Sequence, residues 1–164
     1  MADVSPLSAQ LSHPEAAQRA TAAEQLARLG NEARGAAVPL VRSVADLDES
    51  VREWAVGALE ELGAPSPDDQ AALVPLLEHD NSDVAYWAVT LLGRLGNDGA
   101  PAVPRIAAAL EQSPHRAVRE RAAWALGQLG IAAPEAVTAL RGAASSAEPR
   151  LARMAQSALS RLGE

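Results

Sequence analysis

Four aromatic side chains are the residues of this sequence best suited to recognise a partner. They are Trp54, Tyr86, Trp87 and Trp124, and the chain has no phenylalanine. All 14 basic residues are arginines. Tryptophan, tyrosine and arginine anchor protein interfaces, because they combine a large contact area with polar groups, and tryptophan is also the best ring for a cation. This composition favours binding through ring faces and guanidinium groups.

Groups that could catalyse a reaction or hold a metal are sparse. The histidines His13, His79 and His115 all lie at predicted turns, and His13 and His79 are separated by two structural repeats, whereas the ligands of one metal lie about 2 Å from it. The pair Asp68-Asp69 suits a solvated turn. Cysteine is absent, and so is a glycine-rich phosphate loop. We therefore predict no enzymatic activity, no metal and no cofactor.

The aromatic residues occur within a phrase that the chain repeats five times. It is clearest at 118–130 (VRERAAWALGQLG), and it recurs at 51–63 and 84–96, with weaker copies at 18–30 and 151–163. The closing glycines follow one another at intervals of 33, 33, 34 and 33 residues. Such a period indicates stacked helical repeats that bury their apolar faces on one another. We predict one domain over 1–164, with repeats at about 1–30, 31–63, 64–96, 97–130 and 131–163.

Cap residues and prolines predict two helices in each repeat. The phrase helices are expected at about 14–29, 49–62, 82–95, 114–129 and 148–162, each ended by a glycine suited to a left-handed cap. Asp48 is the expected cap of the second. Their companions are expected at 5–11, 32–45, 68–78, 100–111 and 134–144. Pro39, Pro75 and Pro104 lie inside three companions and should bend them, because proline lacks an N–H; the last companion has Thr138 instead.

The phrase, Val-Arg-x-x-Ala-x-x-Ala-Leu ending in glycine and alternating with a helix that carries Val-Pro, resembles the HEAT repeat. The short bacterial variety found in phycobilin-lyase subunits is the most similar kind. The resemblance covers essentially the whole chain and implies an all-α fold, a right-handed α-α superhelix (HEAT-like solenoid) of about five helix pairs with the first incomplete. HEAT arrays are mainly scaffolds, so the resemblance also implies a non-enzymatic protein.

Charge and hydropathy narrow the possible partners. The formal net charge is −7, which argues against general nucleic-acid binding, since that depends on neutralising phosphates. No stretch approaches the roughly 18 consecutive apolar residues of a membrane span, and the opening MADVSP lacks the regions of a signal peptide. We expect a cytoplasmic protein with another protein or peptide segment as its partner, and neither nucleic acid nor a membrane.

The phrase helix has two distinct faces at about 100° per residue. We number the places of the phrase backwards from its closing glycine, so that place one is the residue just before this glycine. Places twelve, eight, five, four and one form an apolar stripe that should be buried. Places ten, nine, six and two form another arc, which holds all four aromatic residues. In HEAT arrays the second helix of each pair lines the concave side, so the resemblance implies a groove here. The predicted groove residues are Glu53, Trp54, Glu61, Tyr86, Trp87, Arg94, Glu120, Arg121, Trp124, Gln128 and Arg153.

Charges on this arc differ along the chain. Glutamates dominate the first two copies and arginines the last three, with Arg28 and Glu120 as exceptions. A peptide with a basic end and an acidic end would fit this arrangement. The glutamates are Glu24, Glu53 and Glu61, and the arginines are Arg94, Arg121, Arg153 and Arg161.

Three functions are compatible with these features. The first is a scaffold that holds a protein segment or small ligand in the groove. The second is an accessory subunit of an enzyme complex, as in chromophore lyases. The third is a self-assembling structural repeat unit, joined through an exposed apolar stripe on the last helix. We expect the protein to be a monomer or to self-associate weakly. A purely structural alternative is that Trp54 and Trp87 pack together and Arg121 stacks on Trp87.

Overall fold

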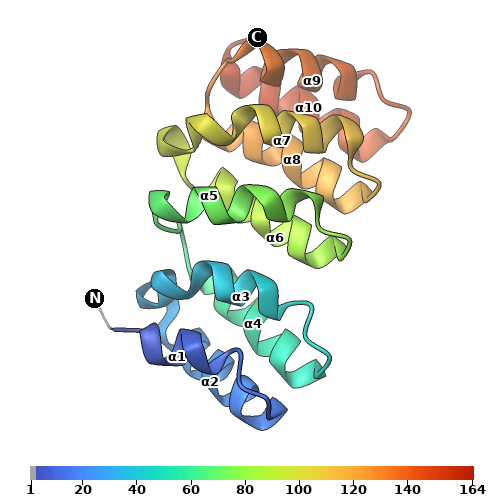
Figure 1. The fold of residues 1–164 in the computed structure, drawn as a ribbon. Helices are drawn as coiled ribbons and strands as arrows, with labels where there is room; N and C mark the ends of the chain where they lie inside the picture. Colours follow the sequence, from blue (N-terminus) through green and yellow to red (C-terminus); the bar gives the residue numbers. More distant parts are fainter. Residues whose placement is uncertain (1–2) are drawn as a thin grey trace. The chain divides into compact units, whose positions relative to one another are not determined.

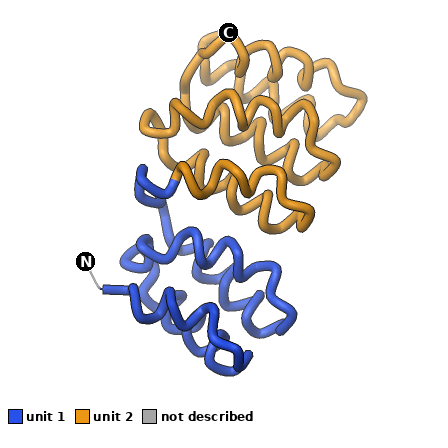
Figure 2. The backbone as a smooth tube through the Cα atoms, viewed as in Figure 1, with its two compact units in different colours: residues 1–69 blue, residues 70–164 orange. Residues whose placement is uncertain are grey.

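The computed structural model describes residues 3–164, which form helices and turns without any β-strand (Figure 1). The all-α class and the repeat fold are as predicted. Two compact units divide the chain, residues 1–69 (unit 1) and residues 70–164 (unit 2) (Figure 2). The single domain over 1–164 stays a prediction.

Unit 1 consists of two helix pairs. The first helices are α1 (Ser5–Gln10) and α3 (Ala37–Ser43), and the phrase helices are α2 (Ala16–Leu29) and α4 (Glu49–Glu61). A 3-10 helix, η1 (Gly30–Ala36), leads into α3, and a second, η2 (Pro67–Asp69), ends the unit. Helices α2 and α4 pack side by side. Leu26, Leu40 and Leu59 are fully buried between the helices.

Unit 2 holds three further repeats. Its first helices are α5 (Gln70–Leu73) continued by η3 (Val74–Glu78), then α7 (Val103–Gln112) preceded by η4 (Gly96–Ala102), and α9 (Pro134–Ala144). Its phrase helices are α6 (Ser82–Gly93), α8 (Arg116–Leu129) and α10 (Pro149–Leu162). Helix α8 packs between α6 and α10, while α7 packs on α9, so the two kinds of helix form two layers (Figure 1).

The predicted buried stripe is confirmed. In copy four its members, from Val118 to Leu129, are at most 2% exposed, and in copy two, from Val51 to Leu62, all are fully buried. The closing glycines of the five copies all have positive φ, between 52° and 79°. Only glycine adopts this conformation without strain, which explains why each phrase ends on this residue. The predicted cap is also confirmed, since Asp48 accepts a hydrogen bond from the Val51 amide.

The prolines within the predicted companion helices lie close to the start of a helical segment. Pro75 and Pro104 lie at the beginning of η3 and α7, and Pro39 lies in the first turn of α3. The first N–H groups of a helix have no acceptor within it, so proline is tolerated there. The predicted mid-helix position is therefore wrong for Pro39 and Pro104, which lie in the first turn of an α-helix that follows a 3-10 segment, whereas at Pro75 the companion changes from α5 to η3 without a break. The companion with Thr138 is continuous from Pro134, as predicted.

An arginine at place eleven of the phrase ties successive turns together. Arg19, Arg52 and Arg119 each donate to the carbonyl six residues earlier, at 2.8 to 2.9 Å. Arg19 also binds Asp46, and Arg119 binds Glu148, both at 2.7 Å and both in the next repeat. We call this arrangement the arginine clamp.

The clamp predicts a specific acid sensitivity. The hydrogen bond from Arg19 holds the pKa of Asp46 below its usual value, against the opposing effect of burial. The stabilisation is therefore complete above the unfolded-state pKa of about 3.9 and is lost as the pH falls through the lower folded-state pKa. We expect Asp46→Asn to lower the urea midpoint at pH 7 and to reduce the loss of stability between pH 4 and pH 2. An unchanged acid dependence in this variant would contradict the role of the clamp.

Candidate functional site

The predicted groove residues of unit 1 lie on the outside of α4. Glu53 and Glu61 are exposed, and Trp54 is 40% exposed. In the described part of the chain, Trp54 and Leu47 are the exposed large apolar side chains. Helix α10 has none, since its Leu159 and Leu162 are half-buried. The exposed apolar stripe expected on the last helix is therefore not present.

In unit 2 the structure brings three predicted residues from two helices into one stack. The Arg121 guanidinium lies 4.5 Å from the centre of the Tyr86 ring and 4.7 Å from that of Trp124. It also donates a hydrogen bond to the Tyr86 hydroxyl. We call this arrangement the arginine sandwich. All three side chains are partly exposed, so the stack lies at the surface.

Trp87 lies beneath this surface. Its side chain is 8% exposed and meets the Tyr86 ring edge to face, with 5.7 Å between ring centres. The expectation that all four rings lie on an exposed face is therefore wrong for Trp87. The suggested stacking of Arg121 on this ring is also wrong, because Arg94 takes that place at 5.9 Å. Trp87 supports the sandwich from below instead of facing a partner.

Glu120 is the second predicted groove residue that proves to be buried. It is 7% exposed and accepts from Arg116 at 2.9 Å and from Arg150 at 3.1 Å. Arg116 and Arg119 also bind Glu148. Three arginines thus neutralise two glutamates beside the sandwich. Because its charge is satisfied by these internal pairs, Glu120 holds α8 and α10 together and is not available to a partner.

Arg121 differs from these neighbours in its electrostatics. Burial lowers the pKa of Arg121, and the nearby charge of Arg150 lowers it further. Among the ion pairs of residues 3–164, none includes Arg121. A partly buried cation without a carboxylate is an unfavourable arrangement. The site would therefore gain from an anion supplied from outside.

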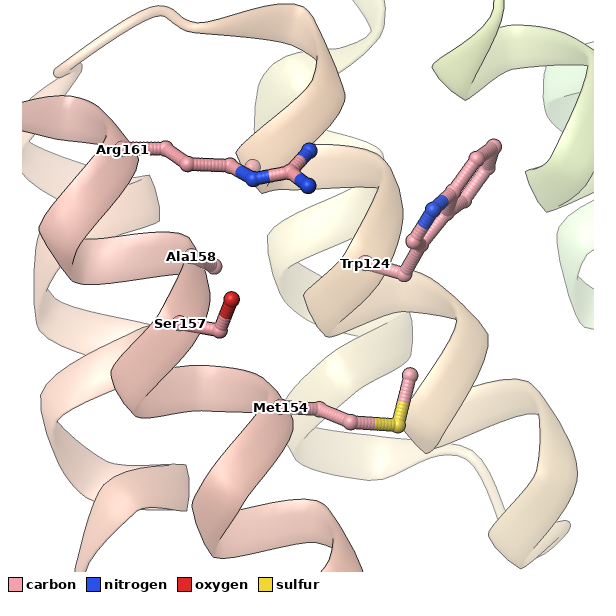
Figure 3. A pocket seen from close by; sticks show the side chains of 6 residues that line it. Trp124, Met154, Ser157, Ala158 and Arg161 are labelled. Carbon is pink, nitrogen blue, oxygen red and sulfur yellow. The ribbon is translucent and has the colours of Figure 1, made fainter.

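A small pocket lies next to the sandwich, between α8 and α10. Its volume is about 80 Å³, and Trp124 forms one wall. Figure 3 shows Met154 and Arg161 extending from α10 toward α8, with Ser157 and Ala158 between them. Gln128 is exposed beside the pocket, and its amide oxygen can accept from both Trp124 and Arg161. Arg153 is exposed on the same helix as Arg161. Met154 and Arg161 were absent from the predicted groove residues, although both occupy the predicted arc.

Close helix packing positions these groups. A Cβ atom added to Gly93 would lie 2.8 Å from the Ala125 Cβ and 2.9 Å from the Trp124 ring. One added to Gly127 would lie 3.0 Å from the Ala158 backbone. Each glycine stands three places before a closing glycine. The two therefore let α6, α8 and α10 approach closely enough for side chains of adjacent helices to stack.

Two kinds of site were not found. Within residues 3–164, no group of three histidine or acidic side chains could hold a metal ion. No helix in this part of the chain is long and apolar enough to cross a membrane.

Comparison with known proteins identifies the family. A model of HEAT repeats matches residues 4–89 and again 70–160, and the chain belongs to this family. No curated protein matches. The narrower likeness to phycobilin-lyase subunits stays a prediction.

Similar solved structures are engineered repeat proteins. A designed armadillo repeat protein in complex with the peptide (KR)4 is 22% identical, with a TM-score of 0.67 over 97% of this chain and 81% of that one. An engineered protein is also 22% identical, with a TM-score of 0.63 over 99% and 80% of the two chains. Computationally designed armadillo repeat proteins for modular peptide recognition give a TM-score of 0.63 and 22% identity over 96% and 81%. At such identities the likeness establishes the solenoid fold alone.

Proposed function

We propose that this protein is a non-enzymatic scaffold that binds an acidic segment of another protein on the phrase-helix face of unit 2. This face consists of Tyr86, Arg121, Trp124, Gln128, Arg153 and Arg161, with Met154 in the adjoining pocket. The observation that carries the proposal is Arg121, a partly buried cation held between two rings without a carboxylate partner. Three other predicted groove residues, Glu53, Trp54 and Glu61, lie in unit 1 and are not part of this face.

The sandwich prepares Arg121 to bind a carboxylate. Contacts with two rings restrict the guanidinium, so little side-chain freedom is lost when an anion binds. A planar guanidinium offers a fork of N–H donors that matches a carboxylate. Arg153 and Arg161 add positive charge nearby, whereas the acid on this part of α8, Glu120, is already neutralised. Charge complementarity thus favours an acidic ligand over a basic one.

The pocket supplies the apolar part of the contact. Trp124 and Met154 line it together with Ala158, and its 80 Å³ suits a single small side chain. A segment that alternates acidic and aliphatic residues could place a carboxylate on Arg121 and an aliphatic group against Trp124. Aromatic and arginine anchors of this kind dominate the energy of many interfaces. The peptides named for the designed armadillo proteins support a peptide as the class of ligand.

Fluorescence anisotropy with labelled peptides tests this function. We expect an eight-residue peptide of alternating glutamate and leucine to bind at least tenfold more tightly than its lysine–leucine counterpart at low salt. The affinity should fall as salt is raised from 20 to 300 mM, because screening weakens exposed charge pairs. Tighter binding of the lysine peptide, or equal binding of both, would rule out an acidic partner on this face.

A further inference from the structure

A second cavity of unit 2 lies on the turns and not on the phrase-helix face. It has a volume of about 390 Å³ and lies between repeats three and four. Glu78, His79 and Asp80 line it from the turn before α6, and Arg105 and His115 line it from α7 and the turn after that helix. Leu77 contributes an apolar wall. Its lining therefore combines two carboxylates with a surface suited to methylene groups.

Equivalent cavities exist between other repeats, and there the arginine clamp reaches them. Between repeats four and five, Arg119 and Glu148 line the cavity, together with Leu110 and Glu111 at the places of Leu77 and Glu78. Between repeats one and two, the cavity is lined by Asp46, which Arg19 binds. In these two gaps the clamp arginine itself, or the acid that it binds, lines the cavity, whereas the arginine that lines the cavity between repeats three and four is Arg105 of α7.

Copy three has no arginine to supply this group. Place eleven is Ala85, which is buried. The carbonyl six residues earlier belongs to His79, and no side chain of residues 3–164 donates to it in the way that Arg119 donates to Ser113. Glu78 pairs with Arg105 at 2.6 Å, whereas Asp80 forms no ion pair with any described residue. The His79 carbonyl and the Asp80 carboxylate are thus left without a cation, whereas Glu78 already has Arg105.

We propose that this cavity binds the guanidinium group of an external ligand, in the place that a clamp arginine occupies in the other repeats. The His79 carbonyl and the Asp80 carboxylate would accept its N–H groups. The aliphatic part of the ligand would lie on Leu77 and the alanines of α7. The ligand is either an arginine side chain of a partner or a free small guanidinium compound. This site is independent of the acidic-segment function, because it lies on different residues and takes the opposite charge.

Histidine NMR resonances provide the readout. Agmatine and N-acetyl-arginine methylamide are the cationic probes, and N-acetyl-citrulline methylamide is the neutral control of the same shape. At pH 7.5 we expect both cations to shift His79 and His115, with affinities on the order of 1 mM, as is usual for a small ligand. The citrulline compound should shift neither. His13 is an internal control, because its turn already carries the Arg19 clamp. Equal shifts from citrulline, or equal shifts at His13, would overturn the proposal.

Two substitutions locate the site. Ala85→Arg should supply the clamp from within, raise the melting temperature and weaken probe binding at least tenfold. Ala152→Arg makes the same change at place eleven of copy five and should leave probe binding unchanged. Asp80 is exposed, so Asp80→Asn should fold, and it should weaken probe binding at least threefold. This variant tests the site if Ala85→Arg fails to fold. Full probe binding in Asp80→Asn, or in folded Ala85→Arg, would exclude this cavity.

The source of the guanidinium follows from a comparison of probes. A three-residue peptide with a central arginine that binds at least tenfold more tightly than agmatine would indicate a partner's side chain. Equal affinities would indicate a small molecule. Both outcomes keep the cation site, whereas shifts from the peptide alone, with none from agmatine, would contradict it.

Discussion

Replacement of Arg121 by methionine should remove the binding of an acidic peptide and leave the stability of the fold almost unchanged. We expect affinity to fall about 30-fold or more, as is usual when a central anchor of an interface is lost. The unfolding free energy should stay within about 1 kcal/mol of wild type. Two cation–ring contacts, each worth on the order of 1 kcal/mol, are lost, but so is the cost of a partly buried, unpaired charge. Methionine retains much of the packing on the rings.

Arg119→Met is the matched control on the same helix. Arg119 binds Glu148 and the Ser113 carbonyl, so its removal takes a donor from that carbonyl and leaves Glu148 with Arg116 alone. We expect it to destabilise the protein by about 1 to 3 kcal/mol and to leave peptide affinity unchanged. Urea denaturation and anisotropy on both variants give the comparison. If Arg121→Met is the destabilised variant and still binds the peptide, the sandwich is only a structural cation–π stack.

The fold was largely predictable because its signals are local and repeated. An apolar stripe at helical spacing and a glycine at each helix end specify the phrase helices. The five copies of the phrase indicate that these helices stack on one another. The companion helices were harder to predict. A proline in a helical sequence is compatible with a bend or with a helix start, and Pro104 alone does not distinguish them. The structure shows a helix start, because the 3-10 helix η4 precedes α7. Such a 3-10 helix has no strong sequence signature.

For the site, the sequence predicted which residues share one face of a helix, but not how neighbouring helices bury them. Trp54, Trp87 and Arg121 all stand at place nine, yet Trp54 is 40% exposed and Trp87 is 8% exposed. The same place thus has different burial in different copies, because burial depends on neighbouring side chains that the period does not specify. Glu120 was misassigned for the same reason, since its partners Arg116 and Arg150 lie on α8 and α10.

The arginine clamp was missed although a signal for it exists. Arginine occupies place eleven in three of the five copies, and for Arg19 an acid follows 27 residues later in the next repeat. A search for charge pairs 27 to 29 residues apart, a little less than one repeat length, would have found it. Its absence at Ala85 would then have marked the gap between repeats three and four as different from the others.

Close packing around Gly93 leads to a second large expected effect on stability. Gly93→Ala should destabilise unit 2, although alanine is the better helix former by about 1 kcal/mol. The added methyl group would lie 2.8 Å from the Ala125 Cβ and 2.9 Å from both the Ala125 Cα and the Trp124 ring. Two of these atoms belong to the backbone or lie next to it, so they can yield only if α8 moves. Overpacking of this kind costs on the order of 1 to 3 kcal/mol.

Gly142→Ala provides the control within the same unit. Gly142 lies in α9, and no atom is found within 4 Å of its added Cβ. This variant should be more stable than wild type by about 0.5 to 1 kcal/mol. The two variants carry the same substitution with opposite expected signs, and urea denaturation measures both. Because a shift of α8 also moves Trp124, Gly93→Ala should weaken acidic-peptide binding as well, and Gly142→Ala should not. Stabilisation by both variants would show that the glycine at this place does not control the spacing of α6 and α8.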